Sequence, residues 1–77
     1  MNFREFFKGR LRDLRKERNE TQKQVAEDIG ITSRHYQKFE SGEILPSLEN
    51  FFALAGHFGV SLDYLAGYTE VRDIKHE

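Results

Sequence analysis

Between Thr21 and Gly42 the sequence contains two short helix patterns separated by a glycine, and this arrangement limits the fold more than any other feature. Thr21 opens the stretch TQKQ, in which the threonine and the glutamine three residues later can form a capping box at a helix start. Gly30 suits the end of that helix, and Thr32 offers the N-cap of the next one. The sequence therefore predicts two short helices joined by a tight turn.

A tight pair of helices has requirements that this stretch meets. The point where the helices cross needs a small residue, which is Ala26 here, and the turn needs a residue that tolerates positive φ, which is Gly30. Such a pair is typical of a helix-turn-helix unit, whose exposed second helix fits a DNA major groove about 12 Å wide. The apolar positions that would hold both helices on a scaffold are Val25, Ile29, Ile31, Tyr36 and Phe39.

Three further segments have helical patterns. In the segment Asn2–Arg18, apolar residues recur at helical spacing, and we expect the remaining positions to form a basic face. A fourth helix follows Ser47 and stops at Gly59, and a fifth follows Ser61 and ends at Gly67. No strand pattern or internal repeat is present, so we expect an all-α fold of five short helices. The basic face of the first helix comprises Arg4, Lys8, Arg10, Arg12, Arg15, Lys16 and Arg18, and the apolar face of the fourth comprises Leu48, Phe51, Phe52, Leu54, Ala55 and Phe58.

Charge and composition narrow the class of protein. Residues 1–38 carry ten Lys/Arg and six Asp/Glu (net +4), whereas residues 39–77 carry two and seven (net −5). The 77 residues suffice for one small domain, and they include no cysteine, which excludes disulfides and suits a reducing compartment. The longest apolar run, Phe51–Ala55, is too short to cross a membrane, and no signal peptide is recognisable. We expect a cytoplasmic domain without a membrane partner.

The sequence offers no candidate for catalysis. The three histidines, His35, His57 and His76, lack metal-ligand spacing, and we expect each to be an exposed or helix-terminal imidazole. No glycine-rich phosphate loop, nucleophilic triad or carboxylate cluster is present. We therefore expect neither an enzyme nor a protein that holds a metal or another cofactor.

Residues Gln22 to Ser41 resemble the helix-turn-helix of the phage lambda repressor and Cro superfamily, also called the xenobiotic-response-element family. The resemblance covers about residues 7–67 without a gap. It implies a compact five-helix lambda-repressor-like DNA-binding domain in residues 1–67, with the helix-turn-helix at helices 2 and 3, and a C-terminal tail in 68–77 as a dimerisation extension. The matching residues are Thr21-Gln22, Val25-Ala26, Ile29-Gly30-Ile31, Phe39-Glu40, Gly42, Pro46-Ser47-Leu48 and Gly59-Val60-Ser61-Leu62-Asp63.

The resemblance also implies which residues bind DNA. Gln22 occupies the place of a glutamine that binds a phosphate and supports the recognition helix, and Lys23 follows it. Side-chain chemistry agrees, since Arg and Lys pair with guanine O6 and N7 and Gln pairs with adenine N6 and N7. Thr32 is expected mainly to cap its helix. The residues that match base contacts and nearby phosphate contacts are Thr32, Ser33, Arg34, Gln37 and Lys38.

Other positions bear on the scaffold and on affinity. Arg15 and Glu40 match an arginine–glutamate pair that joins the first helix to the recognition helix in many members. Tyr36 replaces a small β-branched residue, so either the core is larger or the hydroxyl reaches a polar neighbour. The connector residues 43–45 are acidic and apolar where relatives carry basic and polar residues, which should weaken phosphate contact.

The functional expectation is a transcriptional regulator, and specifically a repressor, that binds double-stranded DNA as a homodimer on a palindromic operator. One alternative is an antitoxin or a phage or mobile-element module whose main partner is another protein. Another is a ligand-sensing domain, although the chain is short for a domain that holds a separate pocket. The apolar residues expected at the dimer surface are Tyr64, Leu65, Tyr68, Val71 and Ile74.

Overall fold

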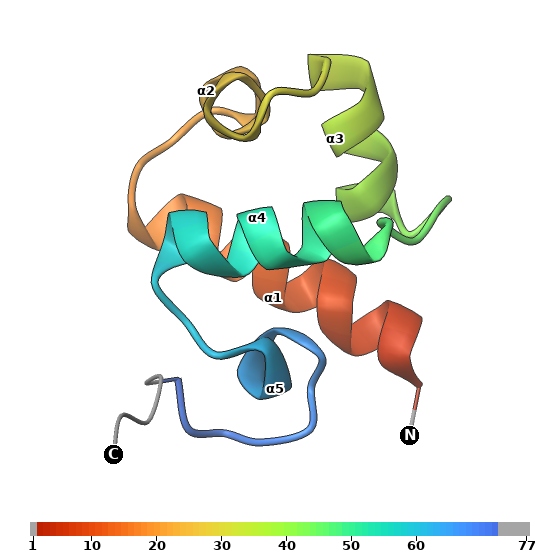
Figure 1. The fold of residues 1–77 in the computed structure, drawn as a ribbon, viewed down its shortest axis with the longest axis vertical. Coiled ribbons are helices and arrows are strands. Elements are labelled where there is room, and N and C mark those ends of the chain that lie inside the picture. The colour runs from red at the N-terminus through yellow and green to blue at the C-terminus, as the bar shows by residue number, and fades with distance from the viewer. Residues whose placement is uncertain (1, 73–77) are drawn as a thin grey trace.

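The computed structural model describes residues 2–72, which form five helices and no strand. The all-α, five-helix prediction is confirmed. In Figure 1, α2 and α3 occupy one end of the molecule, α5 occupies the other, and α1 and α4 lie between them. The helices are α1 (Phe3–Glu17), α2 (Gln22–Ile29), α3 (Ser33–Ser41), α4 (Leu48–Phe58) and α5 (Leu62–Leu65).

Each helix begins at a side chain that caps it. Thr21 Oγ1 accepts a hydrogen bond from the Gln24 backbone N–H at 3.0 Å, and Gln24 Oε1 accepts one from the Thr21 N–H at 2.7 Å, which completes the capping box. At the end of α2, Gly30 adopts a left-handed conformation with φ 78°, and the next backbone N–H returns to the Ala26 carbonyl at 3.0 Å. The other N-caps are Asn2, Thr32, Ser47 and Ser61.

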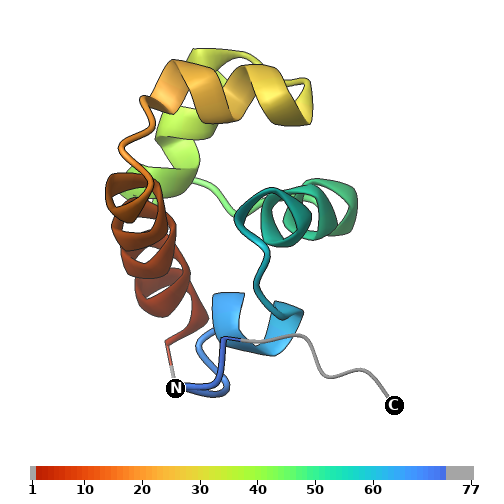
Figure 2. The ribbon, with the colours of Figure 1, turned by 90° about the vertical axis from the view of Figure 1, so that its left-hand side faces the viewer.

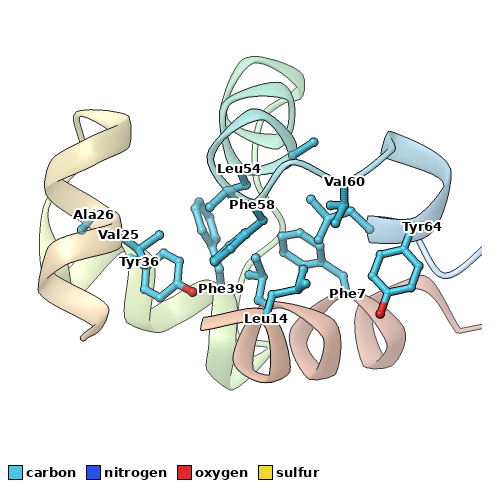
Figure 3. Close-up of a cluster of buried hydrophobic side chains, with 13 residues drawn as sticks. Phe7, Leu14, Val25, Ala26, Tyr36, Phe39, Leu54, Phe58, Val60 and Tyr64 are labelled. Carbon is cyan, nitrogen blue, oxygen red and sulfur yellow. The ribbon is translucent and has the colours of Figure 1, made fainter. Parts of the chain in front are cut away.

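A single hydrophobic cluster lies between the five helices (Figure 3). Phe7 from α1 meets the edge of Phe39 from α3, with ring centroids 6.3 Å apart, so the first helix supports the third directly. Tyr36 is also fully buried in this cluster. The remaining members are Leu11, Leu14, Val25, Ala26, Leu54, Ala55, Phe58, Val60, Tyr64 and Leu65.

The apolar face of α4 is narrower than the sequence pattern predicts. Leu48 and Phe52 are 70% and 54% exposed, whereas Leu54, Ala55 and Phe58 are buried. A helix that packs on one side buries only a stripe about 100° wide, and positions 48 and 52 lie outside it. The prediction that all six apolar residues face inward is therefore wrong for these two.

Arg10 is also placed differently from the prediction. It is only 9% exposed and faces the carboxyl-terminal segment, not solvent. Its guanidinium donates to the carbonyl oxygens of Tyr64 and Thr69, the latter at 2.7 Å, and to the Glu70 carboxylate at 3.0 Å. The charge also lies 4.1 Å from the centre of the Tyr64 ring. Arg10 is therefore a structural residue and not part of a basic surface.

Residues 66–72 pack back on α1 and α5. The Arg72 guanidinium donates to both carboxylate oxygens of Glu17, at 2.7 and 2.6 Å, and the Ser61 N–H donates to the Arg72 carbonyl at 2.8 Å. Among the residues predicted for a dimer surface, Tyr64 and Leu65 are buried in the monomer core, so they are not available. Tyr68 and Val71 are exposed, and Ile74 lies outside the described residues.

None of the helices found in residues 2–72 is long and apolar enough to span a membrane.

The packing at Gly67 leads to a stability prediction. Gly67 has φ 85°, and a Cβ there would lie 2.4 Å from the Cβ of Phe6, an atom too close to its backbone to move aside. Gly67→Ala should lower the free energy of unfolding by about 2 kcal/mol, through left-handed strain and the clash. Gly9→Ala, inside α1, where the new Cβ would meet no side chain and no other segment within 4 Å, should raise it by about 0.5–1 kcal/mol. Urea denaturation measures both, and equal effects of the two substitutions would contradict this packing.

Candidate nucleic-acid interface

The outer face of α3 is the exposed polar surface of the helix-turn-helix. Tyr36 and Phe39 point into the core, so the opposite side of the helix faces away from the rest of the molecule. Figures 1 and 2 show α3 at the edge of the fold, beside α2. Arg34 and Gln37 are exposed on this side, and Lys38 is half-buried. A helix with this placement can enter a DNA major groove.

The structure brings most of the predicted DNA-binding residues to this end. Arg34, Gln37 and Lys38 line one shallow hollow together with Ser41 and Glu43. Thr32 Oγ1 accepts from the His35 N–H at 3.0 Å, so its hydroxyl caps α3. Ser33 is the first residue of α3, and Gln22 and Lys23 are the first two residues of α2.

A buried carboxylate connects α3 to both preceding helices. Arg15 on α1 donates to Glu40 on α3 through Nε at 2.7 Å and Nη2 at 3.0 Å. The Tyr36 hydroxyl donates to Glu40 Oε2 at 2.5 Å, and the side-chain amide of Gln22 donates to Oε1 at 3.2 Å. The Glu40 carboxylate is 6% exposed and accepts four hydrogen bonds. It thus sets the position of α3 relative to α1 and α2.

This network shifts the protonation of its members. Burial alone would raise the pKa of Glu40, but hydrogen bonds from Arg15, Tyr36 and Gln22 outweigh it and hold the pKa below its ordinary value of 4.5. Burial raises the pKa of Tyr36, and its hydrogen bond to Glu40 raises it further. The second alternative for Tyr36 is confirmed, because its ring is fully buried and its hydroxyl reaches a polar neighbour.

The connector after α3 carries an acid on the same side as Lys38. Glu43 lies 3.6 Å from Lys38 Nζ and forms an ion pair with it. Arg4 from α1 donates to the Gly42 carbonyl at 2.7 Å, which fixes the start of the connector. Ile44 packs against the core, and Leu45 is 43% exposed.

One polar cluster, centred on His57, is not predicted from the sequence. The His57 side chain lies in the last turn of α4 and is 7% exposed, so of the two expected positions it takes the helix-terminal one and not the exposed one. Its Nδ1 is 2.5 Å from Asp28 at the end of α2, and its Nε2 is 2.9 Å from Glu20 before α2. The cluster joins α4 to both ends of α2. A single histidine with no nearby pattern gave no signal of these partners.

The Glu20 carboxylate in this cluster is held in its charged form. Its burial would raise its pKa, but hydrogen bonds from His57 and Arg18 lower it overall. Within residues 2–72 no group of three or more histidine, cysteine or acidic residues could hold a metal ion.

Comparison with known proteins agrees with the geometry. A helix-turn-helix family model matches residues 11–65. The chain is 47% identical over 60 residues to the cryptic phage CTXphi transcriptional repressor RstR of Vibrio cholerae serotype O1, a match covering 78% of this chain and 54% of that protein. It is 41% identical over 68 residues to the uncharacterized HTH-type transcriptional regulator YobD of Bacillus subtilis, covering 88% and 61%.

A more distant relative is the HTH-type transcriptional activator BcrR of Enterococcus faecalis, 32% identical over 65 residues, with 84% of this chain and 32% of that protein covered. The chain spans little more than half of the length of the first two relatives. No solved structure gives a significant match. All three relatives are named as transcriptional regulators, which confirms the expectation that the chain is not an enzyme.

The lowered pKa of Glu40 predicts a defined loss of stability in acid. Its contribution to folding is complete above pH 4.5 and is lost as the pH falls through the lower folded-state pKa. Glu40→Gln should therefore be less stable than the wild type at pH 7. It should also lose less stability than the wild type as the pH falls from about 5 to about 2. Urea denaturation at several pH values measures this difference.

Glu27→Gln is the matched control, because Glu27 is exposed and has no ion pair within residues 2–72. It should retain the pH dependence of the wild type. Identical acid profiles for the wild type and Glu40→Gln would contradict the role assigned to the buried carboxylate.

Proposed function

Because this chain belongs to the helix-turn-helix family, we propose that it binds double-stranded DNA sequence-specifically and represses transcription. The observation that carries the proposal is the exposed face of α3, where Arg34, Gln37 and Lys38 lie together on a helix held by a buried carboxylate. Repression is proposed over activation because the relative RstR is named a repressor over a well-matched region, whereas the activator BcrR is more distant.

In this proposal the contacts divide into two kinds. Arg34 and Lys38 would pair with guanine O6 and N7, and Gln37 would pair with adenine N6 and N7. Ser33 would contact bases or phosphates next to them, and Thr32 would help mainly by capping α3. Gln22 and Lys23 at the start of α2 would bind phosphates, which position the domain without reading sequence.

A dimer on a palindromic operator is part of the proposal. One domain of this size covers a short site, so a symmetric pair with half-sites about 34 Å apart would supply the missing specificity. The exposed Tyr68 and Val71, on the segment that packs over α1 and α5, are apolar candidates for the contact between copies. The carboxyl-terminal residues would then serve the dimer and residues 1–67 the DNA.

A second candidate function is a regulatory module whose main partner is another protein. It is favoured by three exposed apolar side chains after the recognition helix, Leu45, Leu48 and Phe52. Selection of binding sites from a random duplex pool at about 100 mM salt, with the mass of the protein measured in solution, separates the two. An enriched palindrome bound by a dimer supports the repressor, whereas no enrichment supports the protein-binding module.

Substitution of Arg34 tests the proposed base contacts. Arg34→Ala should relax the preference at one base pair of the selected site, by about 1–3 kcal/mol of discrimination. Lys23→Ala, which removes the same charge from an exposed position on α2, should weaken binding to all sequences alike. Fluorescence anisotropy with single-base operator variants measures both. If Arg34→Ala leaves every base preference intact, the placement of α3 in the groove is wrong.

Substitution of Glu43 tests the effect of the acid beside the recognition helix. Glu43→Gln removes the partner of Lys38 and a negative charge from the face that meets phosphates. Affinity for DNA should rise several-fold at low salt, and its dependence on salt should become steeper. Glu49→Gln makes the same change of charge in the first turn of α4, away from Lys38, and should have a smaller effect. Equal effects of the two substitutions would mean that Glu43 does not act on Lys38.

A further inference from the structure

The side of α1 next to the recognition helix carries basic residues four apart. Arg4, Lys8 and Arg12 lie on successive turns. Arg4 donates to the Gly42 carbonyl at the end of α3, and the Lys8 side chain lies beside Gly42, where a Cβ would come within 3.0 Å of Lys8 Cδ. These contacts place this side of α1 along the carboxyl-terminal end of α3.

Arg12 reaches a polar hollow where α1, α2 and α3 meet. The hollow has a volume of about 320 Å³ and is lined by Arg12, Gln22, Gln37, Glu40 and Ser41. Arg12 is exposed and forms no ion pair with any residue in the range 2–72. Two residues expected to bind DNA, Gln22 and Gln37, thus share a hollow with an arginine outside the helix-turn-helix.

The acid in the hollow does not neutralise Arg12. Glu40 is paired with Arg15 and accepts further hydrogen bonds from Tyr36 and Gln22. The positive charge of Arg12 is therefore available to an outside group. Gln22 uses one of its two amide hydrogens on Glu40, and the exposed Gln37 amide has no hydrogen bond within residues 2–72. A cation beside free amide donors suits an anion with several acceptor oxygens.

We propose that this hollow binds a phosphate of the DNA backbone, with Arg12 as the charged contact. The inference rests on the proposed DNA binding and adds Arg12 to the residues that contact the DNA backbone. Figure 2 shows α1 beside the end of α3 that is far from the α2–α3 turn, so Arg12 would extend phosphate contact beyond the helix-turn-helix. The hollow on the other side of Gln37 contains the Lys38–Glu43 pair, which neutralises itself, and Arg34, which the proposed function assigns to a base. Arg12 is then the cation of these two hollows that is left for a phosphate.

The test is the salt dependence of DNA affinity for the full chain with Arg12→Ala. Losing one phosphate contact should reduce the slope of log K against log salt by about 0.9, which corresponds to roughly eightfold weaker binding at 0.1 M salt. The loss should be equal for the selected site and for a random duplex, with base preferences unchanged. Arg12→Lys should retain most of the slope, because it keeps the charge.

Arg72→Gln is the matched control for charge, since Arg72 lies near α5 at the other end of the molecule. It should leave the slope unchanged, and thermal unfolding of each variant shows that the folded protein is measured. An unchanged slope in Arg12→Ala, together with lost base preference in Arg34→Ala, would overturn this inference and leave the proposed function standing. A wild-type protein that binds no DNA would overturn both.

Discussion

The buried carboxylate of Glu40 is the interaction on which the arrangement of the first three helices depends. Arg15 approaches it from α1, Gln22 from α2 and Tyr36 from the same helix, so a single charged group receives four donors. A carboxylate removed from water is costly unless its hydrogen bonds are satisfied, and here they are. The orientation of α3, and with it the position of every residue on its exposed face, is consequently determined by polar contacts in addition to the hydrophobic core.

The near-neutral charge of the whole chain conceals an uneven distribution of positive and negative residues. Positive residues collect on α1 and α3, while the second half of the sequence is acidic. Some positive charges are used internally, since Arg10 holds the segment 66–72 and Arg15 holds Glu40. Those left exposed, such as Arg12 and Arg34, lie at or near the α2–α3 end. Counting basic residues therefore overstates the charge available to a polyanion, and their pairing decides what remains.

Local signals made most of the fold predictable. The five caps and the glycines that end α2, α3 and α4 are short-range features, so the helix boundaries follow from residues within a few positions. The placement of Arg34, Gln37 and Lys38 on one exposed face follows from helical spacing. Whether these residues contact bases stays a prediction.

Other features depend on contacts between distant segments. The burial of Arg10 requires the carbonyl oxygens of residues 64 and 69, and the burial of His57 requires Asp28 and Glu20. The exposure of Leu48 and Phe52 depends on which stripe of α4 faces the core. Periodicity within one helix contains no information about such partners. The polar hollow at Arg12 was missed for the same reason, since its walls come from three helices.

The ion pair between Lys38 and Glu43 has a consequence for kinetics. A domain that searches a genome spends most of its time on non-target DNA, where attraction to phosphates alone holds it. A lysine paired with its own acid adds little to that attraction until a partner of better geometry replaces the carboxylate. Residence on random sequence would therefore be short and transfer between distant segments frequent, while the bound lifetime at a matching site would depend on contacts that only that site offers.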